Sequence, residues 1–417
     1  MDRALLEQLF HAAVAQAQPS LAVRLNLPPK PVGRTVVIGA GKASSQMARA
    51  FEQSWDGPIS GLVVTRYGYA EACERIEIVE AAHPVPDEAG FLAARRMMEM
   101  VSGLSPNDLV VALISGGGSS LLPAPAPGLT LDDEQAINRS LLASGAPIAV
   151  MNLIRNQFSI IKGGRLAARC APARVATLVV SDVPGDDPAV VASGPTIPLT
   201  GTRELARKYA TLYRLDLPPH AHSLLVGEDN LAPLPSDPLL ARNSVRTIAS
   251  AALSLEAAAD LARGQGIGAA ILSDSIEGEA RDVAQVHAAM AREIAARNRP
   301  FSKPVVLLSG GETTVTLRGQ GRGGRNAEFL LAFAIAIDGV DGITALAADT
   351  DGIDGPEDNA GAFADGSTAT RLRKAGIDPL AALADNDAYS AFAAIGDLLV
   401  TGPTGTNVND FRAILVR

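Results

Sequence analysis

The stretch of the chain that most constrains its fold is Leu109–Ser120, with the sequence LVVALISGGGSS. An apolar run typical of a buried strand leads directly into three glycines and two serines. Glycines in such a turn let backbone amides converge on an anion, and the hydroxyls add further hydrogen-bond donors. The segment therefore predicts a strand whose end holds a phosphate.

Strand and helix patterns alternate along the first half of the chain, as in an open, doubly wound α/β sheet. The composition agrees, because 47% of the residues are hydrophobic and only 4% are aromatic, so the core must be built from Ala, Leu, Val and Ile. The expected strands are Thr35–Gly39, Gly61–Thr65, Arg75–Val79, Leu109–Ile114 and Ala176–Ser181, and the expected helices are Ala43–Gln53, Asp87–Met100, Leu131–Ala143 and Ile148–Ile161.

The length of 417 residues predicts two domains. Prolines interrupt the region from Tyr213 to Leu240, which we expect to be irregular and to hold the boundary, giving domains 1–235 and 236–417. In the second domain we expect helices Ser254–Arg263, Glu279–Arg297 and Asn326–Ile337, and strands Ala269–Ser273, Val305–Ser309, Glu312–Leu317 and Ile343–Ala348. The close spacing of two of these strands predicts a hairpin about Gly310-Gly311, and therefore a mixed sheet.

Charge and cysteine content exclude several classes of protein. A net charge of −9 supplies no basic face for a nucleic acid. Cys73 and Cys170 are too few for a disulfide framework and are expected to be reduced thiols. The N-terminal segment mixes acidic residues with apolar ones at helical spacing, unlike a signal or transit peptide, and no apolar run is long enough to span a membrane. We therefore expect a cytoplasmic protein without a nucleic-acid or membrane partner.

The sequence does not determine the oligomeric state, for which a homodimer is the candidate.

A second glycine turn, Gly39-Ala-Gly-Lys-Ala-Ser44, lies between an expected strand and an expected helix. It lacks the first glycine of a P-loop, and it has Ser44 where the dinucleotide fingerprint has its third glycine. The turn still offers Gly39 and Gly41 for close backbone approach, helix N-terminal amides and the cation of Lys42. We interpret it as a phosphate-binding turn, against the alternative that Lys42 is a solvated loop residue.

Other charged residues have both a functional and a structural interpretation. Arg155 and Lys162 are seven residues apart and can share one helix face, either exposed to solvent or in contact with a small carboxylate substrate. Asp182, Asp186 and Asp187 follow one strand, and Asp349, Asp351 and Asp354 follow another. Such carboxylates can hold Mg²⁺ together with phosphate oxygens, or they can cap turns.

A Gly/Arg-rich loop, Gly319–Phe329, carries Arg322 and Arg325 into a helix. Arginine suits the charge that develops on a transferring phosphoryl group, although such a loop can also be simply basic and disordered. The five histidines show no zinc spacing, and no Gly-x-Ser-x-Gly elbow of a serine hydrolase is present.

These motifs in their order along nearly the whole chain resemble the class II glycerate kinases, a family also known under the older name hydroxypyruvate reductase of tartrate degradation. The matching segments are Gly39–Ser44, Ser115–Ser120, Arg155–Arg165, Ser181–Asp186, Ala192–Thr196, Ser309–Thr313, Gly323–Glu328, Thr350–Pro356 and Gly402–Asp410. The chain departs from the family at Asn156-Gln157, where a Lys-His pair is often found.

The resemblance implies a Rossmann-like, three-layer N-terminal domain, a smaller α/β C-terminal domain with a mixed sheet, and an active site in the cleft between them. It also implies phosphorylation of D-glycerate at O2 with ATP and Mg²⁺, with Lys42 and Arg325 as catalytic cations. Asp182 or Asp186 would orient the 2-hydroxyl or place the metal, and we assign Asp182 to catalysis and Asp186 and Asp351 to the metal. The residues expected to bind nucleotide or substrate are Gly39, Gly41, Ser44, Ser115, Gly116, Gly117, Gly118, Ser119, Ser120, Arg155, Lys162, Gly310, Gly311, Glu312, Asn326 and Glu328.

Two other classes of function stay open. An NAD(P)H-dependent hydroxypyruvate reductase is suggested by the near-dinucleotide turn at Gly39, with Arg66 as a partner for a 2′-phosphate. The sequence lacks an obvious histidine acid with an acidic partner beside that turn. The other class is a sensor that binds glycerate or nucleotide without turnover.

Overall fold

The computed structural model describes residues 2–183, 185–227 and 232–417, which form two compact units. The parallel-sheet unit comprises Pro19–Val183 and Asp187–Ile248, and the mixed-sheet unit comprises residues 2–18, 185–186 and 249–417. The predicted division at residue 235 stays a prediction. No helix in the described residues is long and apolar enough to cross a membrane.

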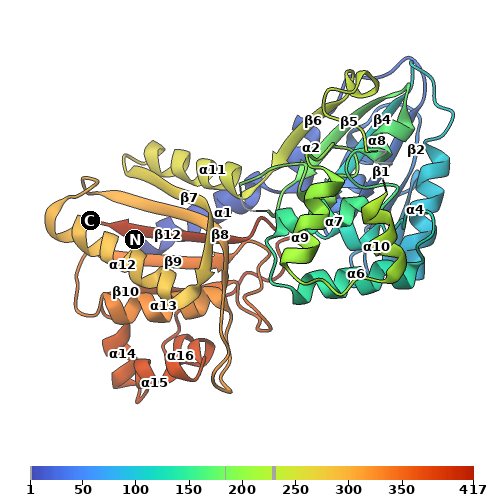
Figure 1. Ribbon diagram of the computed structural model, residues 1–417. Coiled ribbons are helices and arrows are strands. Elements are labelled where there is room, and N and C mark those ends of the chain that lie inside the picture. The colour runs from blue at the N-terminus through green and yellow to red at the C-terminus, as the bar shows by residue number, and fades with distance from the viewer. Residues whose placement is uncertain (1, 184, 228–231) are drawn as a thin grey trace. The chain divides into compact units, whose positions relative to one another are not determined.

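The parallel-sheet unit contains six strands in the order β3-β2-β1-β4-β5-β6. Strands β1 to β5 pair in parallel, and helices cover the sheet, so the predicted doubly wound architecture is confirmed (Figure 1). The strands are β1 (Thr35–Ala40), β2 (Ile59–Arg66), β3 (Ile76–Ala81), β4 (Leu109–Ser115), β5 (Arg174–Val180) and β6 (Ser244–Ala249). The helices are α2 (Pro19–Leu25), α3 (Ser44–Ser54), α4 (Glu88–Met100), α5 (Gly118–Leu121), α6 (Leu131–Ala143), α7 (Ile148–Gln157), α8 (Arg165–Cys170), α9 (Arg203–Leu212) and α10 (Pro219–Val226), with 3-10 turns Val191–Ser193 and Pro238–Leu240.

Strands β1 and β4 are fully buried along their length, which explains their continuous apolar sequences. From β1 the chain winds outward through β2 and β3, and then returns to place β4 on the other side of β1. The strand order therefore reverses between β1 and β4. In open α/β sheets, ligands bind outside the carboxyl ends of the strands at such a switch point.

The region from Tyr213 to Leu240 is more regular than its prolines suggested. Helix α10 forms there because Pro219 occupies the first helical turn, where the missing amide hydrogen costs nothing. Strand β6, which the sequence did not indicate, completes the edge of the sheet. Residues 228–231 of this region lie outside the described residues.

The mixed-sheet unit contains six strands in the order β11-β10-β9-β12-β8-β7. Helices α1 and α11 pack on one face, and α12 and α13 on the other (Figure 1). The strands are β7 (Gly268–Glu279), β8 (Val305–Thr314), β9 (Ile343–Asp349), β10 (Gly361–Asp365), β11 (Leu398–Leu399) and β12 (Asp410–Val416). The helices are α1 (Asp2–Gln16), α11 (Ala251–Gly264), α12 (Ala280–Arg297), α13 (Arg325–Ala336), α14 (Thr368–Lys374), α15 (Pro379–Ala384) and α16 (Ala388–Ala394).

The predicted mixed sheet is confirmed, but the hairpin proposed as its cause is wrong. Gly310 and Gly311 lie inside the continuous strand β8, which pairs in parallel with β7. The antiparallel pairs come instead from β12, which lies between β8 and β9, and from β10. Strand β7 continues to Glu279 and pairs with β8 as far as Thr314, so both glycines lie within a paired strand, and Gly311 has φ +117°, a conformation that favours glycine.

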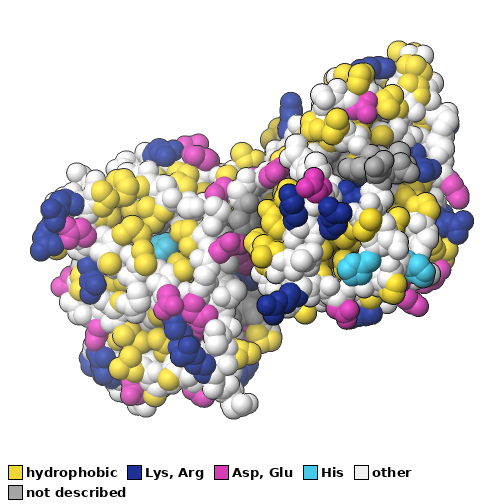
Figure 2. Space-filling view, in the orientation of Figure 1, with side chains coloured by type: hydrophobic (Ala, Val, Ile, Leu, Met, Phe, Trp, Pro, Cys, Tyr) yellow, Lys and Arg dark blue, Asp and Glu magenta, His cyan; other side chains and the backbone are white. Residues whose placement is uncertain are grey.

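On the face shown in Figure 2, basic and acidic groups are interspersed with apolar ones on each unit.

Candidate functional site

The two glycine turns predicted to bind phosphate meet at the switch point of the parallel sheet. One follows β1 and the other follows β4, and these strands are neighbours. The backbone amide of Lys42 donates to the carbonyl of Gly116 at 2.8 Å, and the amide of Ala43 donates to Ser115 Oγ at 3.0 Å. The buried Ser44 hydroxyl donates to the carbonyl of Leu113 at 2.9 Å. Ser44 and Ser115 therefore hold the two turns together, and Gly39 and Gly41 lie on the first of them.

Lys42 brings a positive charge to these turns. Its side chain is partly exposed and forms no ion pair with the residues that the structure describes. A Cβ added at Gly117 would lie 3.3 Å from Lys42 Cε and 2.9 Å from His83 Nε2, so both side chains border this glycine. Gly117 has φ +79°, a left-handed conformation that glycine adopts without strain. The lysine and the glycine turn thus form one site.

His83 is a residue of this site that sequence reasoning set aside. It follows β3, at the same edge of the sheet as the glycine turns. Burial, together with the charges of Lys42 and Arg66, lowers the pKa of His83 to about 4. The imidazole is therefore neutral at physiological pH and adds no second positive charge beside Lys42. The only sequence signal that could have found it is its position after a strand.

The carboxylate of Asp182 packs directly against the second glycine turn. A Cβ at Gly116 would lie 1.7 Å from Asp182 Oδ2, so only glycine leaves room for the acid. The turn continues through Gly118 into α5, where Ser120 Oγ donates to the carbonyl of Gly117 at 3.1 Å. Asp182 therefore lies beside the backbone that was predicted to hold phosphate.

Arg155 reaches the same turn through other side chains. It donates to Asn138 Oδ1 at 2.9 Å and to Asn152 Oδ1 at 3.2 Å, and burial lowers its pKa. Ser193 Oγ donates its one proton to Asn152 Oδ1 at 2.8 Å and is hydrogen-bonded to the Ser119 hydroxyl at 2.9 Å. Arg155 is thereby connected to the turn by two intermediate residues.

Lys162 occupies a different environment. Its ammonium group donates to Glu134 Oε1 at 2.6 Å, and the two side chains are 2% and 6% exposed. Helix α7 ends at Gln157, so Lys162 does not continue the helix face of Arg155 as the spacing had suggested. The structure places Lys162 in a buried ion pair.

A second group of predicted residues gathers in the mixed-sheet unit around Arg325. Its guanidinium contacts Asp349 and Asp410 at 2.6 Å and Glu312 at 3.0 Å. Burial by itself would lower the pKa of Arg325, but the three carboxylates outweigh it and raise the pKa above its usual value. Arg325 is held in place as a permanent cation, with 24% of its side chain exposed.

The carboxylates around Arg325 have different environments. Burial and the charge of Asp351 raise the pKa of Asp349 well above its usual value, although Arg325 acts in the opposite direction. Asp354 accepts hydrogen bonds from the amides of Asn326 and Ala327 at 2.9 and 2.8 Å and so caps α13. Burial raises the pKa of Asp354 to about 6 despite these bonds.

The other residues predicted for this unit differ in whether they contact the carboxylates around Arg325. Asn326 Nδ2 donates to Asp410 Oδ1 at 2.9 Å and so joins it. Glu328 binds Arg281 and Asn386 instead, with distances of 2.5 and 2.9 Å. Gly310 and Gly311 are paired within the sheet.

No described residues form a group of three or more His, Cys, Asp or Glu side chains suited to a metal ion. Mg²⁺ in phosphoryl transfer needs only one or two carboxylates in addition to phosphate oxygens. The neighbouring carboxylates of Asp349 and Asp351 fit that need, because their mutual repulsion would be relieved by a cation. The metal assignments to Asp186 and Asp351 stay predictions.

Comparison with known proteins identifies the family. Residues 5–226 match a family described as a domain of unknown function (DUF4147), and residues 305–410 match the MOFRL family. A D-glycerate 2-kinase from Thermotoga maritima is 40% identical over 97% of this chain and 95% of its own length. The chain belongs to the class II glycerate kinase family. The resemblance seen in the sequence is therefore confirmed.

Other members of the family support the same relationship. A crystal structure titled as glycerate kinase from Thermotoga maritima has a TM-score of 0.91 and 39% identity, and covers 99% of both chains. An Agrobacterium vitis protein named "Putative hydroxypyruvate reductase" is 52% identical over 99% of this chain and 94% of its own length. The two names that the family carries are thus both found among relatives of this chain.

Proposed function

We propose that this protein transfers the γ-phosphoryl group of ATP to the 2-hydroxyl of D-glycerate, giving 2-phosphoglycerate and ADP. The observation that carries the proposal is the meeting of Lys42 and two glycine turns at the switch point of the sheet. The similarity to a protein named D-glycerate 2-kinase supports the choice of substrate and acceptor atom.

The proposed reaction demands positioning and charge neutralisation more than covalent chemistry from the protein. In the transfer, the 2-hydroxyl oxygen forms a bond to the γ-phosphorus while the bond from that phosphorus to the β,γ-bridging oxygen breaks, and ADP leaves with the electron pair. We propose Lys42 and Arg325 as the cations that stabilise the charge on the transferring group. His83, which lies beside Lys42, is neutral and adds no positive charge of its own to the site.

Other residues near the glycine turns would bind and orient the substrates. The backbone of Gly116–Gly118 and the hydroxyls of Ser119 and Ser120 would hold phosphates or glycerate. Asp182, against the same turn, would orient the 2-hydroxyl and accept its proton. Mg²⁺, when bound, would neutralise phosphate charge, and Asp351 with Asp349 offers carboxylates for it.

The experiment that tests the proposal couples the reaction to enolase. Purified protein is incubated with Mg-ATP and D-glycerate, and enolase reports 2-phosphoglycerate by forming phosphoenolpyruvate. Formation of phosphoenolpyruvate would support the 2-kinase, since enolase does not accept the 3-phosphate directly. ATP consumption without this signal would move the phosphorylation to another position or acceptor.

Replacement of Lys42 separates catalysis from simple binding. We expect Lys42→Met to reduce kcat/KM by about 10³-fold or more, because a cation facing the transferring charge is lost, while the circular dichroism spectrum is unchanged. Lys30→Met is the control, because Lys30 is exposed and paired with Asp56. Equal turnover by Lys42→Met and the unmodified protein would contradict the assignment of Lys42.

A reductase is the second candidate function, because the relative named "Putative hydroxypyruvate reductase" shares 52% identity with this chain. Arg66, the suggested partner for a 2′-phosphate, lies with its guanidinium carbon 3.6 Å from the centre of the Tyr69 ring. Oxidation of NADH or NADPH with hydroxypyruvate, without any ATP consumption with glycerate, would favour this candidate.

A further inference from the structure

Arg66, the last residue of β2, lies at the edge of the parallel sheet where the glycine turns meet. The amide of Gly41 in the first turn donates to the carbonyl of Val64 at 3.1 Å, so β2 borders that turn. Side chains alternate between the two faces of a strand, which places Arg66 on the same face as Val64. Val64 shares a core cluster with Leu121 of α5, the helix into which the second turn continues. Arg66 is therefore on the side of the sheet that carries the second glycine turn.

A turn after β2 orients the guanidinium group of Arg66. The amide of Tyr69 donates to the carbonyl of Arg66 at 3.2 Å, and the centre of the Tyr69 ring lies 3.6 Å from the guanidinium carbon. Stacking on a ring uses the face of the guanidinium plane and leaves the N–H groups at its edge free to donate. Arg66 Nε is buried and has no hydrogen-bond partner among the described residues, and no described carboxylate forms an ion pair with the group. The guanidinium is thus oriented by the protein but lacks a counter-ion from it.

The acidic residues near Arg66 are engaged by other groups. Glu80 Oε1 accepts hydrogen bonds from two backbone amides of the turn after β2, at 2.6 and 3.2 Å. Asp87 accepts from the Tyr67 hydroxyl at 2.8 Å and caps α4. Both acids therefore stabilise the local fold instead of neutralising Arg66.

The pKa of His83 reflects the resulting excess of positive charge. Burial is the main cause that lowers this pKa to about 4, and the charges of Lys42 and Arg66 lower it further. No carboxylate of a described residue offsets these two charges at His83. An oxyanion bound between Lys42 and Arg66 would relieve their mutual repulsion.

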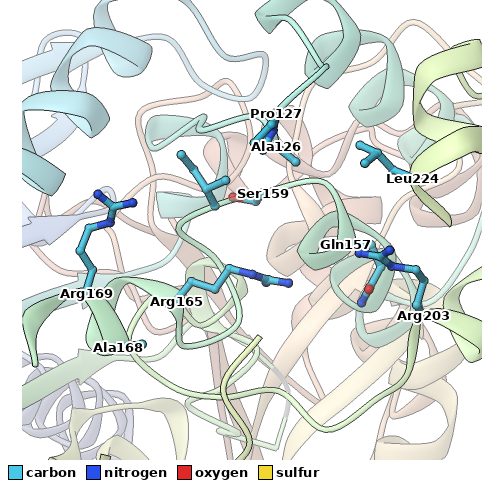
Figure 3. A pocket seen from close by; sticks show the side chains of 10 residues that line it. Ala126, Pro127, Gln157, Ser159, Arg165, Ala168, Arg169, Arg203 and Leu224 are labelled. Atoms are coloured by element: carbon cyan, nitrogen blue, oxygen red, sulfur yellow. The ribbon is translucent and has the colours of Figure 1, made fainter. Parts of the chain in front are cut away.

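Two other arginines of this unit show the contrast with Arg66. Arg165 and Arg203 line a pocket of about 600 Å³ (Figure 3). Arg165 donates to two backbone carbonyls and Arg203 to one, all at 2.9 Å. The protein itself supplies acceptors to these arginines, whereas Arg66 has none in the described part of the chain.

We infer that Arg66 is a substrate-binding residue, whose guanidinium group donates to an oxyanion of a substrate held at the glycine turns. The inference rests on the proposed function for the presence of a substrate there. A planar guanidinium pairs with carboxylates and phosphates through two parallel hydrogen bonds. The oxyanion is therefore the carboxylate of the hydroxy acid or a phosphate of the nucleotide.

Calorimetric titration of the full-length protein distinguishes these two sources. D-glycerate is compared with its methyl ester, and ADP with adenosine, so that each pair differs in its oxyanion. We expect Arg66→Gln to weaken binding of the charged member of one pair by about tenfold or more, and to leave the neutral member unchanged. An effect on D-glycerate alone assigns the carboxylate, and an effect on ADP alone assigns a phosphate. Equal losses for both charged members would indicate a general effect of charge and contradict the inference.

A conservative variant and a control accompany this substitution. Arg66→Lys keeps the charge but not the planar fork, and should recover only part of the affinity that Arg66→Gln loses. Arg95→Gln removes an exposed arginine of α4 and should change neither affinity. Loss of affinity in Arg95→Gln as large as in Arg66→Gln would also contradict a specific contact.

NMR titration of His83 checks the placement of Arg66 without any ligand, and the signal is assigned by its loss in His83→Gln. Arg66→Gln should raise the pKa of His83, because one of the two charges that lower it is removed. Binding of the ligand whose oxyanion Arg66 contacts should raise this pKa in the unmodified protein as well. An unchanged pKa in Arg66→Gln would place the guanidinium away from the glycine turns and overturn the inference.

The outcomes separate this inference from the proposed function. If the coupled assay gives no phosphoenolpyruvate while Arg66→Gln weakens binding of D-glycerate or ADP, the kinase proposal fails and the inference holds. Phosphorylation of glycerate with unchanged affinities in Arg66→Gln would leave the kinase proposal intact and overturn the inference. Failure of the unmodified protein to bind either D-glycerate or ADP would overturn both.

Discussion

At the scale of single residues, the surroundings of a charged group determine what it can do. The sequence predicts both Lys42 and Lys162 as cations of a binding site. In the structure only Lys42 is partly exposed and borders Gly117 of the glycine turn. Lys162 is buried with Glu134, whose second carboxylate oxygen has no hydrogen-bond partner among the described residues. A buried ion pair of this kind affects mainly the stability of the fold, because removing one partner leaves the other charge buried without a counter-ion.

We therefore expect Lys162→Met to destabilise the fold by about 3–5 kcal/mol, since it leaves the Glu134 carboxylate buried without its counter-ion. The double variant Lys162→Met/Glu134→Leu should recover most of that loss, because neither charge is then stranded. Urea denaturation of the single and double variants measures both values. A stable Lys162→Met protein with a raised KM for glycerate would instead support the predicted role in substrate binding.

At the scale of elements, strand β8 shows how pairing overrides a local turn signal. The Gly310-Gly311 pair was interpreted as a hairpin turn, but it lies between β7 and β12 in the sheet. A Cβ at Gly311 would lie 2.3 Å from both the backbone nitrogen and the backbone oxygen of Ile276. The glycine is thus needed for close approach of β7, where the register between the two strands shifts.

Gly311→Ala should accordingly destabilise the mixed-sheet unit by about 3 kcal/mol or more, because backbone atoms of β7 cannot yield as a flexible side chain can. Gly264→Ala is the matched control. Gly264 lies in α11 with open space around its Cβ position, and the same change there should stabilise the protein by up to about 1 kcal/mol. Thermal unfolding compares the two variants. Equal effects of both changes would show that Gly311 is not constrained by β7.

At the scale of the whole molecule, the chain does not divide into its two units at a single point. Residues 2–18 group with residues 249–417, although they come first in sequence. The reason is hydrophobic, because Leu6, Leu9 and Phe10 of α1 are completely buried in the same core as Leu255 of α11. The N-terminal helix thus completes one face of the mixed sheet.

We expect Phe10→Ala to destabilise the mixed-sheet unit by about 3–5 kcal/mol, because a fully buried ring in contact with Phe411 is lost. Gln8→Ala on the exposed side of the same helix is the control and should change stability by less than about 0.5 kcal/mol. Hydrogen exchange of β12 reports the effect locally. Unchanged protection in Phe10→Ala would contradict the structural role of α1.

The sequence by itself determined the α/β class, strands β1 to β5 of the parallel sheet and the two glycine turns, because each of these depends on local patterns of apolar residues and glycine. It also determined the family, through motifs spread along the chain. Only the tertiary structure decided which charges are buried, that His83 lies beside Lys42, and that α1 packs on the mixed sheet. Spacing along a chain predicts neighbours only while one element continues, as the end of α7 before Lys162 shows. Burial and strand pairing depend on segments far apart in sequence, which no local pattern records.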